Sequence, residues 1–182
     1  MVPTPGLASL LVSIALMAPA SPQEFSFKVA SLSGGTLGDK DFRGKIVIID
    51  IWATWCGPCR MVIPHLVKLQ DKYKTRGVTV LGLNSDDDAT EGPGREAVAG
   101  FVRQMGINYP IGLMNAETYA EVSRVMGSSA DAGFSLPTTI VLSREGRVIR
   151  KYPGYFQGQE RELEDLITGM LAAEKPPAPA KP

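Results

Sequence analysis

Two long apolar runs dominate the hydrophobic pattern of the chain. Residues 45–53, KIVIIDIWA, and residues 78–84, VTVLGLN, are rich in β-branched side chains and lack the alternation of a strand with one solvated face. Between them, apolar residues at helical spacing predict a helix over residues 60–73, which ends before Gly77. Strand, helix and strand in this order predict a βαβ unit whose two strands are parallel and buried on both faces.

Shorter periodic segments flank this unit. Alternation, helical spacing and turn residues define each of them. The further elements expected are a strand over 25–30, a loop over 85–94, a helix over 96–106, a short edge strand over 109–113, a helix over 116–127, an antiparallel hairpin of strands 138–143 and 147–152, and a helix over 159–173. This order predicts an α/β sandwich with a mixed sheet.

The two ends of the chain differ from its body. Residues 6–18, GLASLLVSIALMA, are apolar and uncharged, and Ala18 and Ala20 form the small-x-small pattern of a signal peptidase site. We therefore expect residues 1–20 to be a signal peptide, with export to the periplasm or cell envelope; left uncleaved, the segment would be a membrane anchor or a buried helix. Residues 174–182 are rich in Pro and Ala and predict a disordered tail. One domain over residues 21–173 is left.

Charge and cysteine content restrict the function. The 19 Lys and Arg residues balance 19 Asp and Glu residues, so no basic excess favours nucleic acid or an anionic membrane surface. The triplet of aspartates at residues 86–88 fits a solvated loop with a helix cap better than a cation site. Two cysteines allow one disulfide or one reactive site, and no disulfide scaffold.

Both cysteines lie in WATWCGPCRM, residues 52–61, where the buried strand gives way to a helix. A structural disulfide across two residues would close a small loop and stabilise little. A zinc site would need further ligands, and His65 is the only histidine; we expect this histidine on the helix surface or in packing, and no metal. At a helix start, unpaired N–H groups and the helix dipole favour a thiolate, and Pro58 suits the first turn. The motif predicts a redox-active dithiol of Cys56 and Cys59.

The segments DIWATWCGPC, residues 50–59, and SLPTT, residues 135–139, resemble the thioredoxin superfamily. The lead-in DFRGKIVIIDIWATWC, the N-terminal strand and the extra segment over residues 85–126 resemble its exported TlpA/ResA branch. The resemblance covers residues 25–173. It implies a thioredoxin-like three-layer sandwich, with a mixed central sheet, helices on both faces, an N-terminal strand extension and a central βα-type insertion.

The resemblance also implies site residues. Cys56 would be the exposed attacking thiol and Cys59 the buried resolving thiol. Pro137 would be a cis-proline packed against the disulfide, and the preceding residue would pair with the backbone of a bound peptide. The residues expected to contact substrate are Trp55, Gly57, Pro58 and Leu136.

Asp50 matches the buried acid of thioredoxins. A carboxylate inside an apolar strand is costly unless it has a role, so the pattern itself supports this match; a cap or a salt bridge is the alternative. The Asp50 carboxylate could accept the proton of Cys59 through water. Val62 stands where members devoted to cytochrome c maturation commonly carry Glu, so the resemblance does not extend to that role.

These features predict a reductase of protein disulfides that works through a Cys56–Cys59 dithiol/disulfide cycle. We expect no cofactor, a monomer, protein disulfide substrates and a membrane donor of thiol-reducing equivalents. An exported oxidase or isomerase on the same fold is the main alternative. A peroxiredoxin-like peroxidase would need Thr in place of Ala53, and a copper chaperone would need wider cysteine spacing and a distant histidine.

Overall fold

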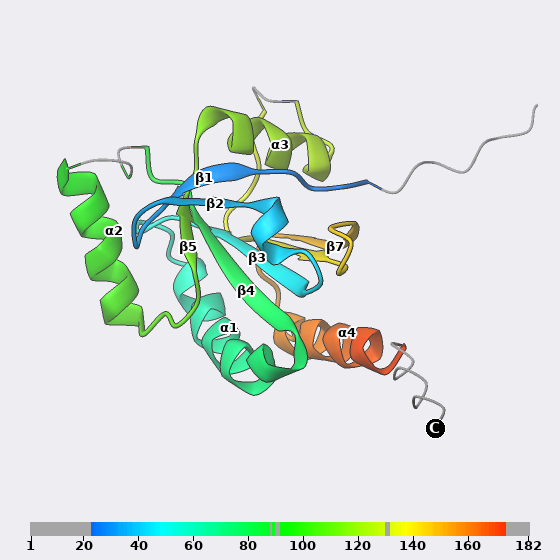
Figure 1. Ribbon diagram of the computed structural model, residues 1–182. Helices are drawn as coiled ribbons and strands as arrows, with labels where there is room; N and C mark the ends of the chain where they lie inside the picture. The colour runs from blue at the N-terminus through cyan, green and yellow to red at the C-terminus, as the bar shows by residue number, and fades with distance from the viewer. Residues whose placement is uncertain (1–22, 88, 90–91, 130–131, 174–182) are drawn as a thin grey trace, which may run out of the picture.

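The computed structural model describes residues 23–87, 89, 92–129 and 132–173 (Figure 1). The expected signal peptide and the expected C-terminal tail lie outside the described residues. The strands are β1 Lys28–Ser31, β2 Thr36–Gly38, β3 Ile46–Trp52, β4 Val78–Asn84, β5 Ile111–Leu113, β6 Thr138–Leu142 and β7 Val148–Pro153. The helices are α1 Cys59–Tyr73, α2 Gly92–Met105, α3 Ala116–Met126 and α4 Gln159–Ala173, with short 3-10 turns at Asp39–Phe42 and Lys74–Arg76.

Within the described residues, the strands form one mixed sheet in the order β2-β1-β5-β4-β3-β6-β7. Strands β3 and β4 are parallel and in register from Ile46 opposite Val78 to Trp52 opposite Asn84. This pairing confirms the predicted βαβ unit. Strand β6 pairs antiparallel with the other side of β3, and β7 pairs antiparallel with β6.

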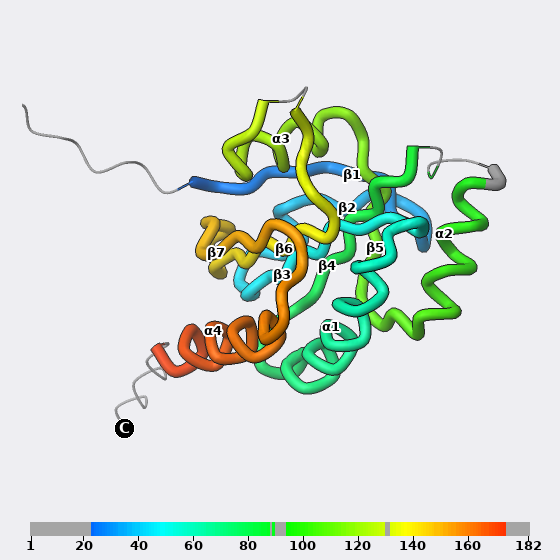
Figure 2. The backbone as a smooth tube through the Cα atoms, turned by 180° about the vertical axis from the view of Figure 1, so that it is seen from behind, coloured from blue at the N-terminus to red at the C-terminus, as the bar shows by residue number. Residues whose placement is uncertain are grey.

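Helices cover both faces of the sheet, as predicted for a three-layer sandwich (Figures 1 and 2). The alternation of β3 assigns Ile46 and Ile48 to the face that packs against α1, α2 and α4. Its intervening residues, among them Ile49, belong to the opposite core, which α3 and the N-terminal segment cover. Because both faces are buried, all seven residues of β3 and all seven of β4 are buried. In the described part of the chain, no helix is both long enough and apolar enough to cross a membrane.

Two sequence predictions about the order and length of elements were wrong. Strand β5 lies inside the sheet and not at its edge, because β1 pairs with it and β2 extends the sheet further. The three-residue β2 is too short to give a periodic signal. Helix α2 begins at Gly92 and not near residue 96, because Pro is compatible with the first helical turn, where no intrahelical N–H bond is needed.

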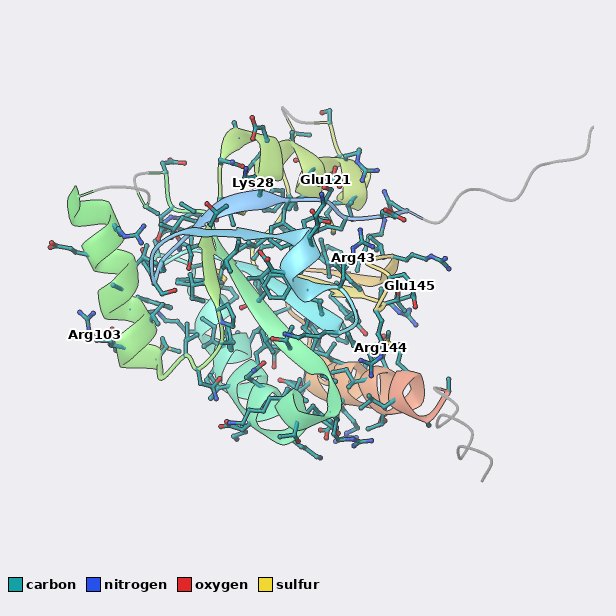
Figure 3. All side chains as sticks on the ribbon, viewed as in Figure 1. Lys28, Arg43, Arg103, Glu121, Arg144 and Glu145 are labelled. Atoms are coloured by element: carbon teal, nitrogen blue, oxygen red, sulfur yellow. A yellow bond between two sulfur atoms is a disulfide. The ribbon has the colours of Figure 1, made fainter. Side chains whose placement is uncertain are left out.

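The N-terminal segment before β1 is fixed to α3 and to the turn between β6 and β7. On α3, Glu121 accepts a hydrogen bond from the backbone N–H of Ser26 at 3.0 Å, and Arg124 donates to the Glu24 carbonyl at 2.8 Å. The backbone N–H of Phe25 donates to the carbonyl of Gly146 in the β6–β7 turn at 3.2 Å. Arg43, which follows β2, donates to the carbonyl of Glu145 in the same turn (Figure 3). These bonds hold the extension over the α3 face of the sheet.

Candidate active site

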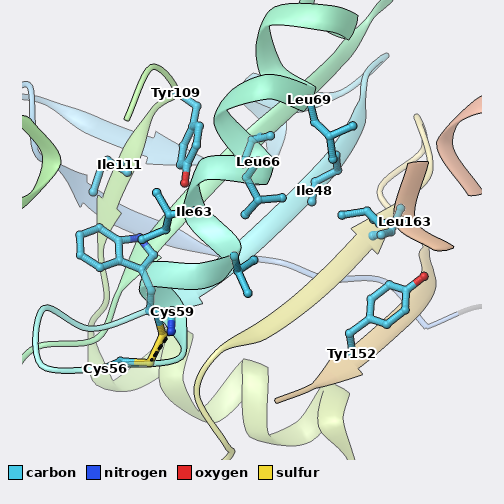
Figure 4. Packing of buried hydrophobic residues seen from close by; sticks show 14 of the residues in the cluster. Ile48, Cys56, Cys59, Ile63, Leu66, Leu69, Tyr109, Ile111, Tyr152 and Leu163 are labelled. Atoms are coloured by element: carbon cyan, nitrogen blue, oxygen red, sulfur yellow. Dashed lines mark hydrogen bonds between the residues drawn. A yellow bond between two sulfur atoms is a disulfide. The ribbon is translucent and has the colours of Figure 1, made fainter. Parts of the chain in front are cut away.

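The two cysteines lie in the turn that leads from β3 into α1. They form a disulfide with the Cα atoms 5.4 Å apart. The backbone N–H of Cys59, the first residue of α1, donates a hydrogen bond to Cys56 Sγ at 3.2 Å (Figure 4). A hydrogen bond to sulfur from a helix N-terminus favours the anionic form of that sulfur once the disulfide is reduced.

Cys56 is less exposed than the resemblance to thioredoxins implied. Cys56 is only 3% exposed and Cys59 is fully buried. Cys56 nevertheless borders a surface groove, whereas Cys59 packs in the apolar core under α1. This groove therefore gives a substrate sulfur a route to Cys56.

The groove has a volume of about 380 Å³ and begins at the disulfide. Its lining residues are Trp55, Cys56, Gly57, Pro58, Ser85, Asp87, Tyr119, Phe134 and Leu136. All four residues expected to contact substrate are among them. Trp55 is the most exposed large apolar side chain of the described residues, at 74%. The groove thus combines an apolar rim with a polar wall next to a reactive bond.

Two aromatic residues of the groove were missed by the sequence reasoning. The rings of Tyr119, on α3, and Phe134 lie 4.7 Å apart between centroids with their planes tilted by 40°. Tyr119 follows the helical pattern of α3, and Phe134 lies in a segment without periodicity, so neither position carries a local signal. Only the fold brings them to the disulfide.

The segment before β6 lies at the same end of the sheet. The peptide bond between Leu136 and Pro137 is cis. The Pro137 carbonyl accepts a hydrogen bond from the backbone N–H of Gly154 at 2.7 Å, and the Thr138 hydroxyl donates to the Ser135 carbonyl at 2.6 Å. These bonds position Leu136 on the wall of the groove.

Asp50 lies in the middle of β3 on the face covered by α1. It is fully buried, and neither carboxylate oxygen has a hydrogen-bond partner among the described residues. Burial raises the pKa of the Asp50 carboxyl from 3.8 to about 7. The structure therefore favours neither a cap nor a salt bridge for this residue, and its carboxyl can take up or release a proton near neutral pH.

The Asp86 carboxylate holds the active-site turn in place, and the sequence did not indicate this contact. Its carboxylate accepts hydrogen bonds from the backbone N–H of Thr54 at 3.1 and 3.2 Å and from the Asn84 side-chain amide at 3.0 Å. These contacts tie the turn to the end of β4. Of its acidic neighbours, Asp87 lines the groove and residue 88 lies outside the described residues.

Two residues of α1 complete the surroundings. Val62 is buried in the apolar core, and its aliphatic side chain provides no carboxylate at this position of the helix. His65 lies on the outer side of α1, where Nε2 is 3.3 Å from Glu160 Oε1 of α4. His65 is thus a surface residue of the α1–α4 contact and does not reach the disulfide.

Comparison with known proteins agrees with this fold and motif. The family described as Redoxin matches residues 19–167. The "Thiol-disulfide oxidoreductase ResA" of Bacillus thuringiensis subsp. konkukian is 30% identical over 142 residues, which are 78% of this chain and 73% of the relative. The protein of the same name from Halalkalibacterium halodurans is 26% identical over 152 residues, covering 83% and 78% of the two chains.

Among solved structures, the chain is similar to a thiol:disulfide interchange protein of the thioredoxin family from Chlorobium tepidum. The TM-score is 0.69 at 25% identity, and the match covers 85% of this chain and 99% of the other. The chain therefore belongs to the Redoxin family, among the thioredoxin-fold thiol-disulfide oxidoreductases that include ResA.

Proposed function

We propose that this protein reduces protein disulfides by exchange with the Cys56–Cys59 dithiol. One observation carries the proposal: the two cysteines form a disulfide at the start of α1, and only Cys56 borders the groove. The attacking thiol is then accessible to substrate, while the resolving thiol is shielded from other partners.

The reaction proceeds through a mixed disulfide. The Cys56 thiolate attacks one sulfur of a substrate disulfide, so that a Cys56–substrate bond forms and the other substrate sulfur leaves as a thiolate. Cys59 loses its proton and attacks Cys56 Sγ, which releases the second substrate thiolate and closes the Cys56–Cys59 disulfide. Two electrons pass from protein to substrate, and an external dithiol must return them.

The groove supplies the substrate contacts. Trp55, Gly57 and Pro58 line it next to Cys56 in the chain, and Leu136 lines it from the segment before β6. An extended peptide segment next to the substrate cysteine fits between them, with backbone pairing at Leu136 beside cis-Pro137. The apolar rim favours substrates with an exposed apolar side chain near the disulfide.

Asp50 is the proton acceptor for Cys59. It lies on the α1 side of β3, the side on which Cys59 is buried, and its raised pKa matches proton transfer near neutral pH. A carboxylate that accepts the Cys59 proton through water converts this thiol into a nucleophile at the moment when the mixed disulfide must be resolved.

The proposal also includes the partners of the protein and its location in the cell. Residues 1–20 direct export to the periplasm or cell envelope as a signal peptide or anchor, and residues 21–173 are the redox domain. A membrane protein donates thiol-reducing equivalents, and the protein acts as a monomer without nucleic acid. The intact mass of protein from the native envelope tests the location, since cleavage after Ala20 leaves Ser21 at the N-terminus.

Reduction of insulin disulfides, with dithiothreitol as the electron source, tests the activity. The protein is expected to accelerate the precipitation of insulin B chain, and Cys56→Ser is expected to abolish the acceleration. Wild-type protein without effect above the dithiothreitol background would contradict the proposal.

A further inference from the structure

Three buried polar groups lie together on the α1 face of the sheet. Besides the two oxygens of Asp50, the indole N–H of Trp52 and the hydroxyl of Tyr109 have no hydrogen-bond partner among the described residues. Trp52 is fully buried and Tyr109 is 6% exposed. Buried polar groups in folded proteins are almost always hydrogen-bonded, to the protein or to internal water, because an unpaired one costs free energy.

The position of Gly82 brings these groups close together. Gly82 of β4 is the register partner of Asp50 on β3, so the two residues face the same side of the sheet about 5 Å apart. A Cβ atom at Gly82 would lie 2.9 Å from Trp52 Nε1 and 3.2 Å from Tyr109 Cε2. Both side chains therefore occupy the space next to Asp50 that a side chain at position 82 would fill. Figure 4 shows the Tyr109 hydroxyl directed toward Ile63 of α1, into the interface between helix and sheet.

The hydrogen-bonding chemistry of the three groups is complementary. An ionised carboxylate only accepts hydrogen bonds, the indole N–H only donates, and a phenol can do both. Burial first, and the charge of Asp50 second, raise the pKa of Tyr109 well above 10.0, so this phenol keeps its proton and can donate. One internal water can accept from Tyr109 and Trp52 and donate to Asp50, which is the usual coordination of a buried water.

The other ionisable groups on this face are few. Cys59 of α1 is buried on the same face of the sheet as Asp50, and Tyr152 of β7 lies two strands from Asp50, beyond Thr139 of β6. Helix α4 contributes Gln159, which is neutral and donates to the Thr139 hydroxyl at 3.5 Å.

Outside this layer, Phe101 of α2 stacks on Trp52 with the ring centroids 4.9 Å apart. The Arg60 guanidinium of α1 lies 4.6 Å from the centre of the Phe101 ring, on the solvent side of that stack. Tyr73, at the far end of α1, donates to Glu164. Tyr109 is thus the ionisable donor placed next to Asp50 within the described residues.

We propose that Tyr109 is a positioning residue for thiol–disulfide exchange. Its hydroxyl, together with the Trp52 indole N–H, hydrogen-bonds through internal water to the Asp50 carboxylate and favours the charged form of Asp50. This inference rests on the proposed role of Asp50 as the proton acceptor for Cys59. The inference adds that Tyr109, which follows α2 in the chain and does not line the groove, lowers the pH at which Asp50 can accept the proton.

Titration of the Asp50 carboxyl carbon by NMR in the oxidised protein tests the hydrogen bond directly, with Asp50→Asn to assign the signal. Tyr109→Phe removes only the hydroxyl and should raise the Asp50 midpoint by about one pH unit. Tyr152→Phe is the matched control, because its buried hydroxyl also has no partner among the described residues but lies two strands from Asp50; it should leave the midpoint in place. Unchanged midpoints in both variants, or equal shifts in both, would overturn the proposal.

The pH profile of mixed-disulfide resolution separates this proposal from the proposed function. The Asp50-dependent limb of the profile should move in Tyr109→Phe by the same amount as the NMR midpoint. If the profile has such a limb and Tyr109→Phe leaves it in place, Tyr109 is not a positioning residue, although Asp50 keeps its role. If the NMR midpoint moves and the profile shows no Asp50-dependent limb, the hydrogen bond exists but Asp50 is not the proton acceptor, and the positioning role of Tyr109 falls with it.

Discussion

The backbone N–H of Cys59 donates a hydrogen bond to Cys56 Sγ at 3.2 Å, so the first amide of α1 is directed at the sulfur that borders the groove. The same amide stabilises a Cys56 thiolate after reduction. The two cysteines therefore differ in their surroundings: Cys56 accepts this hydrogen bond and borders the groove, whereas Cys59 is fully buried.

This difference predicts which variant traps a substrate. Cys59→Ser should accumulate a covalent Cys56–substrate disulfide, because the attacking thiol is present and the resolving thiol is missing. Cys56→Ser should trap nothing and should not reduce insulin. Non-reducing gel electrophoresis with mass spectrometry checks both variants; adducts on Cys59 of Cys56→Ser, and none on Cys56 of Cys59→Ser, would reverse the assigned order.

Replacing Asp50 by Asn removes the proposed proton acceptor and keeps the shape of the side chain. We expect resolution of the mixed disulfide to slow by about 10²-fold, the usual range for loss of a general base. Stopped-flow tryptophan fluorescence follows this step if Trp52 and Trp55 report the redox state. In the Asp50→Asn background, Val62→Glu should restore part of the rate if the two positions are alternative places for one acid. A wild-type rate in Asp50→Asn from pH 6 to 9 would remove Asp50 from the mechanism.

The stability of the oxidised protein should depend on pH through Asp50. The folded-state pKa is about 7 and the unfolded value about 3.8, so above pH 4 the unfolded chain loses this proton first. The free energy of unfolding of the wild type therefore falls as the pH rises from about 4 to about 7. Asp50→Asn lacks this loss, so above pH 7 its free energy of unfolding should exceed that of the wild type by up to about 4 kcal/mol. Below pH 4 the pH-dependent part of this difference should vanish.

Urea unfolding at several pH values measures this difference. Asp165→Asn, at an exposed site on α4, is the control and should leave the pH dependence of the wild type unchanged. If Asp50→Asn and the wild type lose stability in parallel between pH 4 and 8, burial does not raise the pKa of the Asp50 carboxyl.

Trp55 should matter for protein substrates and not for small dithiols. Its side chain is 74% exposed on the rim of the groove, so a bound peptide can bury it. We expect Trp55→Ala to lower kcat/KM for insulin reduction by about tenfold, the effect of losing part of a buried aromatic contact, and to leave the reaction with dithiothreitol unchanged. Met61, 50% exposed on α1 and not part of the groove, provides the control variant Met61→Ala. Equal losses in the two variants would argue against a substrate contact at Trp55.

The central part of the fold could be predicted from the sequence because its signals are local. The β-branched runs of β3 and β4, the helical spacing of α1 and the cysteine motif between them each lie within a few residues. Non-local features could not be predicted in this way. Tyr109 packs over Gly82, the register partner of Asp50, in space that a side chain at position 82 would fill, and Tyr119 reaches the groove only through the packing of α3 on the sheet.

The interior position of β5 is another non-local feature that the local sequence does not signal. Nothing in residues 109–113 indicates that an N-terminal hairpin will pair with this strand, since the partner lies about eighty residues earlier in the chain. The exposure of Cys56 was overestimated for a related reason: its accessibility depends on the walls of the groove, which come from the β3–α1 turn, the end of β4, α3 and the segment before β6.

The equilibrium redox potential of the Cys56–Cys59 pair tests the central claim most directly. Oxidised and reduced protein are equilibrated with dithiothreitol or glutathione mixtures, and the thiols are counted after alkylation. With Gly and Pro between the cysteines, as in thioredoxin, a reductase should have a potential of about −270 mV. A value of about −120 mV would mark a protein that donates its disulfide to substrates, and would contradict the assignment as a reductase.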